Sequence, residues 1–295
     1  MNLQTLIPLL LKASIFLTVF ALGLQATIAD ATYLFRRPRL LIPGFLSIDV
    51  TMPLLALLLV MTLNLQPAVK VALVVLSVSP VPPIFPKKEL KAGGEEDYTV
   101  GLLVATVVLA IAVIPITMEI FGKISGEALH MSALSVAIIV FKTVLTPLLL
   151  GIALRAVASK LADRMAKPVS SIAAVILILS ALPALFVLIR NNLPLLVNGT
   201  LLAMTVFALV GYFVGHLFGG PDPRDRPVLA AATASRHPGL ALAIAHANFP
   251  EQKLVVPTVI LYVIVSGVVT GLGSKFMNRA KTPVQAEVRN SRLKG

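Results

Sequence analysis

The chain has 295 residues, of which 57% are hydrophobic and 13% are charged, and its mean hydropathy is +0.94. A water-soluble domain of this composition would lack a polar surface, so the sequence predicts an all-α integral membrane protein with several spans. The net charge of +12 is explained by the loops of such a protein, without a nucleic-acid partner. The absence of cysteine excludes disulfides, thiolate metal sites and cysteine nucleophiles.

The apolar residues fall into nine stretches that approach the length of about 20 residues that a membrane helix needs. These stretches are Leu6–Ile28, Leu40–Leu65, Val69–Phe85, Tyr98–Phe121, Met131–Val157, Val169–Ile189, Leu193–Phe218, Val228–Phe249 and Leu254–Met277. The sequence therefore predicts about nine transmembrane helices within one domain, residues 1–277. The basic tail, residues 278–295, has no apolar period, and we expect it to be disordered.

The loop charges predict the orientation of these spans. Arginine and lysine gather in alternate polar segments, "RRPR", "KKELKAGGEED", "KLADRMAKP" and "GGPDPRDRP", and in the tail. The other loops hold only Lys70, Lys123, Arg190 and Lys253. Because cytoplasmic loops carry an excess of basic residues, we expect the N-terminus outside and the C-terminus inside.

The third stretch cannot form a continuous helix. In "VALVVLSVSPVPPIFPKK" it carries Pro80, Pro82, Pro83 and Pro86 within seven residues. Each proline lacks an N–H and clashes with the carbonyl four residues back. Since unpaired carbonyls are costly in lipid, this backbone must line a cavity enclosed by protein or filled with water.

The eighth stretch is also interrupted, by Pro238 and Gly239, directly after Arg236 and His237. The two interrupted segments, residues 69–86 and 228–249, are five spans apart, so a repeated five-helix unit would be inverted. Paired broken helices in two inverted halves are typical of secondary transporters with a binding site at the breaks. The alternative is a pair of ordinary proline kinks.

The chain resembles the bile acid:sodium symporter family, in particular its bacterial members of unknown substrate. The resemblance lies in the order of "SPVPPIFPKKELKAGG", "FKTVLTPLLLGIALR" and "GLALAIA" along nearly the whole chain. It implies a panel domain and a core domain, with two discontinuous helices that cross in the core beside the substrate. It also implies uptake of a small organic anion with sodium across a bacterial inner (plasma) membrane.

The second crossover departs from the family pattern, which reads E-x-G-x-Q-N-x-G-L-A. Aligned on "GLA", this chain has Ala232 in place of the glutamate, Arg236 in place of the glutamine and His237 in place of the asparagine. The first crossover offers only Ser77 and Ser79 as side-chain oxygens. We therefore expect no metal site and no cofactor, and anion binding that depends on Arg236 and only weakly on sodium.

Ionisable residues within the spans are functional candidates, because a charge inside the bilayer is costly. Arg236 is predicted to contact the anion or to stand in for sodium, with pairing to Asp49 as the structural alternative. Asp49 and His237 are candidates for proton coupling, although His237 also fits a neutral hydrogen-bonded role. Lys12 receives no role. The predicted substrate-binding residues are Arg236, His237, Ser77, Ser79, Thr233, Ser235 and Lys142, of which Lys142 equally fits a structural brace.

The sequence thus predicts a secondary active transporter of a small organic anion, embedded in a lipid bilayer. A sodium-independent or proton-coupled carrier of the same fold is the alternative, followed by a channel or a solute sensor. A channel would need a ring of like groups along an open path, whereas this chain has few breaks, and they are asymmetric. An enzyme is not expected, because the spans hold no cysteine, no aspartate pair and no histidine–glutamate metal spacing.

Overall fold

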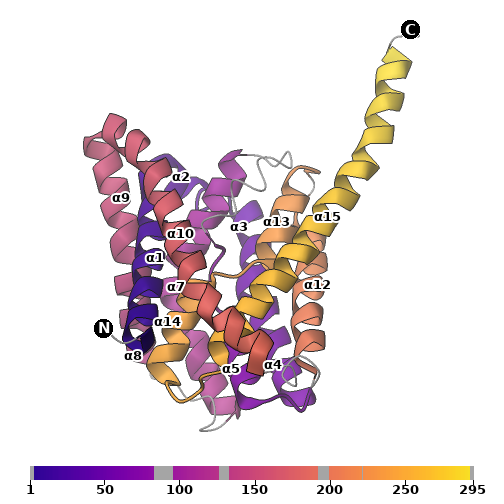
Figure 1. Cartoon of the computed structure of the whole chain (residues 1–295). Coiled ribbons are helices and arrows are strands. Elements are labelled where there is room, and N and C mark those ends of the chain that lie inside the picture. Colours follow the sequence, from indigo (N-terminus) through magenta and orange to yellow (C-terminus); the bar gives the residue numbers. More distant parts are fainter. Residues whose placement is uncertain (1–2, 83–95, 126–132, 192–198, 221, 293–295) are drawn as a thin grey trace.

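The computed structural model describes residues 3–82, 96–125, 133–191, 199–220 and 222–292. All regular elements in these ranges are helices (Figure 1). They are α1 (Leu3–Gln25), α2 (Ile28–Tyr33), α3 (Pro38–Phe45), the π-helix η1 (Leu46–Thr51), α4 (Met52–Thr62), α5 (Pro67–Ser77), α7 (Glu96–Ser125), α8 (Ala133–Val140), the π-helix η3 (Phe141–Leu145), α9 (Thr146–Val157), α10 (Ser159–Asn191), α12 (Leu201–Phe218), α13 (Asp225–Ala234), α14 (Pro238–Asn248) and α15 (Val255–Arg292).

The fold confirms the prediction of an all-α membrane protein. Among the described residues, five helices are long and apolar enough to cross a membrane: Pro38–Thr62, Tyr98–Ile124, Ala137–Val157, Leu201–Phe218 and Val255–Lys275. Each coincides with one of the nine predicted stretches, and two shorter apolar helices, Lys12–Gln25 and Pro67–Ser77, fall in two more. The full number of nine, the inverted repeat and the panel and core domains stay predictions.

Two of the long helices contain a π-helical turn just before a proline. Pro53 follows η1 and Pro147 follows η3, and a proline cannot donate the next backbone hydrogen bond. In both turns a threonine hydroxyl donates to the carbonyl five residues back, Thr51 Oγ1 to Leu46 O at 2.9 Å and Thr146 Oγ1 to Phe141 O at 3.0 Å. The widened turns therefore follow from the Thr and Pro pair, and one of them contains Asp49.

The two predicted helix interruptions are present. Helix α5 ends at Ser77, and the backbone continues without regular structure through Pro82, while Pro83 and Pro86 lie outside the described residues. The second stretch divides into α13 and α14, separated by three residues, Ser235, Arg236 and His237. Pro238 is the first residue of α14, where its missing N–H removes no intrahelical hydrogen bond.

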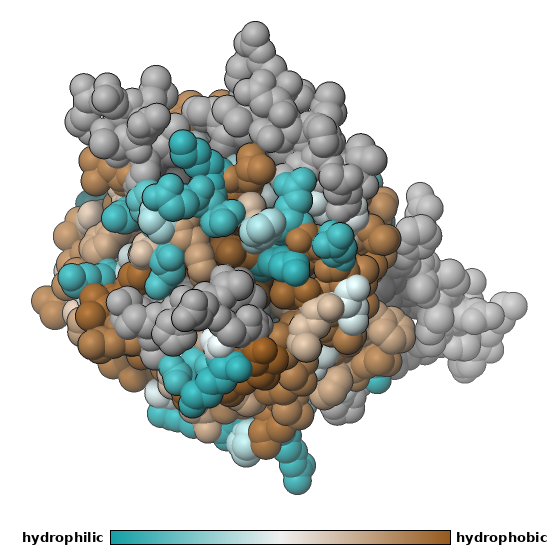
Figure 2. Space-filling model, turned by 90° about the horizontal axis from the view of Figure 1, so that it is seen from below, coloured by the Kyte–Doolittle hydropathy of each residue, from teal (hydrophilic) through white to brown (hydrophobic). Residues whose placement is uncertain are grey.

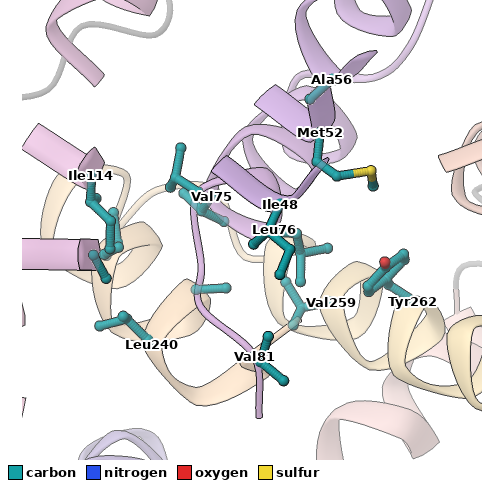
Figure 3. Packing of buried hydrophobic residues seen from close by; sticks show 14 of the residues in the cluster. Ile48, Met52, Ala56, Val75, Leu76, Val81, Ile114, Leu240, Val259 and Tyr262 are labelled. Atoms are coloured by element: carbon teal, nitrogen blue, oxygen red, sulfur yellow. The ribbon is translucent and has the colours of Figure 1, made fainter. Parts of the chain in front are cut away.

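The helices pack in two groups around the breaks. Helices α1, α9 and α10 pack against one another, and α12 packs against α13 and α15. Helix α14 contacts both α1 and α15, so it lies between the groups (Figure 1). The buried hydrophobic core surrounds the extended stretch after α5, where Val81 lies between Leu240 of α14 and Val259 of α15 (Figure 3).

The molecular surface agrees with a membrane protein. Seen from below, polar residues are interspersed with large areas of apolar ones (Figure 2). Many large apolar side chains are exposed along the helices, including Leu134, Ile178 and Leu202. Since such a surface is unstable in water, the sides of the bundle face lipid.

In the tail, α15 continues to Arg292 and projects beyond the bundle (Figure 1). Helix α15 thus includes residues 278–292, and the disorder predicted for the tail stays a prediction. A helix that is already formed extends without a new nucleation cost, and the tail contains good helix formers such as Ala280, Gln285 and Glu287.

Candidate functional site

The two helix breaks lie directly against each other. The backbone N–H of His237 donates to the carbonyl of Pro80 at 2.9 Å, and this bond joins the gap between α13 and α14 to the extended stretch after α5. Both stretches are buried, apart from partly exposed Ser235 and Pro82. The non-helical backbone is therefore enclosed by protein, as irregular backbone at membrane depth must be.

Arg236 binds two carbonyls that prolines leave without a helical donor. Its Nη1 donates to Ser79 O and its Nη2 to Ile48 O, both at 3.2 Å. Pro83 stands four residues after Ser79, and Pro53 stands five residues after Ile48 in the π-helical turn, so neither position can supply an N–H. The guanidinium thus holds the first break and η1 together.

A third carbonyl freed by a proline is also paired with a side chain. Pro238 cannot donate to the carbonyl of Ala234, and the hydroxyl of Tyr262 in α15 donates to it at 2.6 Å. Tyr262 is fully buried, and its ring lies 5.6 Å from that of Phe207 in α12. This hydrogen bond satisfies the last carbonyl of α13 and fixes α15 against the break.

Arg236 and Asp49 interact electrostatically but form no salt bridge with each other. Arg236 is 2% exposed, and its Nε has no hydrogen-bond partner. Asp49 is 7% exposed, and its Oδ2 also has none. The pairing of Arg236 with Asp49 that the sequence raised as a structural alternative is thus electrostatic, without a direct bond, and both side chains keep unused hydrogen-bonding capacity.

His237 is the N-cap of α14. Its Nδ1 accepts a hydrogen bond from the backbone N–H of Leu240 at 3.3 Å, so in the neutral ring the proton lies on Nε2. Nε2 has no hydrogen-bond partner. The side chain satisfies one free N–H at the start of α14 and leaves an N–H donor of its own unpaired.

A cavity of about 230 Å³ opens beside the break, between the two groups of helices. Arg236 and His237 line it together with parts of α1, α10 and α15. Its other lining residues are Ser14, Ile15, Thr18, Pro82, Ser170, Ala174, Leu177, Ser235, Pro238, Gly239, Val263, Ser266, Gly267 and Thr270. No aspartate or glutamate is among the residues described as lining it, so Arg236 gives the cavity a positive charge.

Gly239 is required where α14 meets α1. A Cβ at this position would come within 3.0 Å of both Cγ1 and Cδ1 of Ile15, although ordinary contacts are 3.4–4 Å. Ile15 is 2% exposed, and because its Cγ1 lies close to its own backbone, relief of this contact would require the side chain to shift toward the cavity that it lines. The Pro–Gly pair therefore has two separate roles. Pro238 begins α14, and Gly239 allows α1 to pack closely against it.

The other predicted site residues have different surroundings. Ser235 lines the cavity, whereas the hydroxyls of Ser77 and Ser79 donate to Val74 O and Val75 O of α5. The hydroxyl of Thr233 donates to Ser47 Oγ at 3.1 Å, which makes it a contact between α13 and η1. Lys142 is exposed on η3 and is not among the cavity residues.

Sequence reasoning missed the hydroxyl residues that α1 and α15 contribute to the cavity. Ser14 and Thr18 of α1, and Ser266 and Thr270 of α15, line it in pairs. Each pair has a spacing of four residues, which places both hydroxyls on one face of a helix. That spacing within apolar stretches was the available signal. Tyr262 had none, because its partner is a backbone carbonyl distant in sequence.

Comparison with known proteins finds one family and one relative. The model of a family described as "Sodium Bile acid symporter family" matches residues 13–196, a stretch that includes α5 and ends before α13. The chain is also 26% identical over 252 residues to a Bacillus subtilis protein named "Uncharacterized sodium-dependent transporter YocS". This similarity covers 82% of the present chain and 76% of the relative.

Proposed function

Because the chain belongs to the sodium bile acid symporter family, whose members are transporters, we propose that it is a secondary transporter of a small organic anion. In this proposal the anion binds in the cavity beside the two breaks, and Arg236 supplies the positive charge that holds it. The protein is an integral membrane protein, and we place it in a bacterial plasma membrane with its N-terminus outside, as the loop charges predict.

The observation that carries the proposal is a pair of buried, unpartnered N–H donors on two residues that line a positively charged cavity. Arg236 Nε and His237 Nε2 are both buried without partners, on consecutive residues that line the cavity. Helix α14 begins at the next residue, so its dipole adds a partial positive charge at the same place. An anion accepts hydrogen bonds from such groups, whereas a cation or a neutral apolar solute does not satisfy them.

Apolar side chains among the lining residues support a substrate with an apolar body. Ile15, Leu177 and Val263 line the cavity. The hydroxyls of Ser14 and Thr18 donate to backbone carbonyls, so they offer only their remaining acceptor capacity. We therefore expect a small carboxylate or sulfonate, with its charged end at Arg236 and its apolar end toward α1 and α10.

The contacts of Arg236 support weak dependence on sodium. A sodium ion needs several oxygen ligands, and the carbonyls of Ser79 and Ile48 are here bonded to the guanidinium. A second cation at the same oxygens would be repelled by about 4 kcal/mol at 4 Å and an effective dielectric of 20. Since arginine stays protonated, its charge remains with the protein and does not leave with the substrate.

The position of the cavity supports a carrier. Helices α1 and α10 form one wall, and the break and α15 form the other. Relative movement of two such groups around a fixed site would expose it to each side of the membrane in turn. A channel would instead need a continuous path lined by groups of one kind.

The test is uptake of labelled benzoate into proteoliposomes, in sodium buffer and in potassium buffer. We expect saturable uptake in both, a loss of at least tenfold in Arg236→Gln, and partial recovery in Arg236→Lys. The matched control is Arg155→Gln, because Arg155 also donates to a backbone carbonyl, Leu24 O at 2.8 Å, but lies outside the cavity.

Arg236→Gln removes two hydrogen bonds to buried carbonyls, so its folding is checked by circular dichroism before transport is compared. Undiminished uptake by a folded Arg236→Gln variant would contradict the proposed anion site. Uptake that requires sodium would instead contradict the proposed replacement of sodium, and would agree with the name of the Bacillus relative.

A further inference from the structure

A buried carboxyl group close to Arg236, outside the residues described as lining the cavity, is not used by the proposed function. Asp49 lies in the π-helical turn η1, is 7% exposed, and has an oxygen, Oδ2, without a hydrogen-bond partner. The carbonyl of its neighbour Ile48 accepts a hydrogen bond from Arg236. Asp49 is therefore held near the anion-binding guanidinium but is not bonded to it.

The elements packed on η1, which could bring charged or titratable groups close to Asp49, are α3, α4, α12 and α13. Helix α4 has none. The others, with the break and α15, contribute Arg39, Tyr212, His216, Asp225, Arg226, Arg236, His237 and Tyr262. Asp225 and Arg226 stand in the first turn of α13, about 12–14 Å along the helix from its break. Arg236 is the charged group with which Asp49 interacts.

The charges of this site balance only when no anion is bound. Arg236 and Asp49 then carry one positive and one negative charge. A bound monoanion would add a second negative charge next to a single buried cation. Burying an uncompensated charge is costly, and two carboxylates that share a site do not both stay ionised. A proton on Asp49 restores neutrality while the anion keeps its contact with Arg236.

We propose that Asp49 binds one proton when the anion binds beside Arg236, so that the protein carries an anion and a proton together. The Asp49 carboxylate takes the proton from water and becomes a carboxylic acid, and it returns the proton to water when the anion leaves. This inference rests on the proposed anion site, and it supplies the coupling ion that the replacement of sodium would otherwise leave missing.

The first experiment needs no substrate. Infrared spectroscopy distinguishes a protonated carboxyl group from a carboxylate, and the signal of Asp49 is the one lost in Asp49→Asn. We expect the infrared signal of Asp49 to change from that of a carboxylate toward that of a protonated carboxyl group in Arg236→Gln at the same pH, because this variant has lost the compensating charge. If Asp49 stayed ionised in Arg236→Gln, the proposal would be overturned, because the protonation of Asp49 would then not depend on the charge of Arg236.

The second experiment measures proton uptake during binding of benzoate, by calorimetry in buffers with different ionisation enthalpies. We expect about one proton per benzoate in the wild type near neutral pH, with affinity falling about tenfold for each pH unit above the point where free Asp49 is ionised. Asp49→Asn should bind benzoate with no proton uptake and no such pH dependence. The matched control is Asp225→Asn, another buried aspartate, which should keep both.

The outcomes separate this inference from the proposed function. Benzoate binding without proton uptake in the wild type would overturn the proton site and leave the anion site intact. Proton uptake that persists in Asp49→Asn would assign the proton to another residue and equally overturn it. Absence of benzoate binding would count against the anion site, and the infrared comparison would still decide whether Asp49 and Arg236 share a proton-linked charge.

Discussion

Substitution of Gly239 by alanine tests the contact between α14 and α1 that forms one edge of the cavity. The new Cβ would lie within 3.0 Å of two carbons of Ile15, a residue that is 2% exposed. Overpacking of this kind costs about 1–3 kcal/mol. Ile15 is β-branched and has one strongly preferred rotamer in a helix, so it cannot turn away.

The higher helix propensity of alanine partly offsets this steric cost. Alanine is favoured over glycine inside a helix by about 1 kcal/mol. Gly239 is the second residue of α14, where few intrahelical bonds have formed, so the gain there is smaller. The steric term therefore exceeds the helix-propensity term, and we expect a net loss of about 1–2 kcal/mol in the free energy of unfolding.

The matched control is Gly267→Ala. Gly267 lines the same cavity from the interior of α15, and a Cβ there would have no atom within 4 Å. Only the helix-propensity term remains, so this variant should be as stable as the wild type or more stable. Because the chain has no tryptophan and no cysteine, unfolding is best followed by the helical circular dichroism signal in detergent during heating.

A double-mutant cycle identifies the cause. Ile15→Ala removes the two nearest carbons and leaves His237 Cε1 as the nearest atom, at 3.3 Å from the new Cβ, so Gly239→Ala should cost much less in that background. If Gly239→Ala costs as much with Ile15→Ala as without it, or is as harmless as Gly267→Ala, the close approach of α1 is not the reason for the glycine.

Two further substitutions test other parts of the site. Tyr262→Phe keeps the ring beside Phe207 but removes the donor to Ala234 O. The unpaired carbonyl should lower the free energy of unfolding by about 1–3 kcal/mol in the same thermal assay. An unchanged melting temperature would mean that another group satisfies this carbonyl. Lys142→Met should leave benzoate affinity unchanged, because Lys142 is exposed on η3 and does not line the cavity. The affinity is measured by calorimetry against the wild type. A severalfold weaker affinity would show that Lys142 contributes to substrate binding.

The sequence by itself determined the class of the protein and the location of its irregular backbone. The composition required a membrane environment, and clustered prolines excluded continuous helices after Ser77 and around Pro238. These are local properties, since an apolar stretch needs lipid and a proline lacks its N–H wherever the chain folds. For the same reason, the presence of Arg236 within an apolar segment was sufficient to select it as a functional candidate.

The tertiary structure decided which groups meet. The carbonyls freed by Pro53, Pro83 and Pro238 belong to three segments, and only the folded chain shows that Arg236 and Tyr262 bind them. Whether Arg236 bonds to Asp49 or to backbone carbonyls depends on differences of an ångström or two between packed helices, which no sequence pattern records. The hydroxyls of α1 and α15 likewise become part of one site only because α14 brings the two groups of helices together.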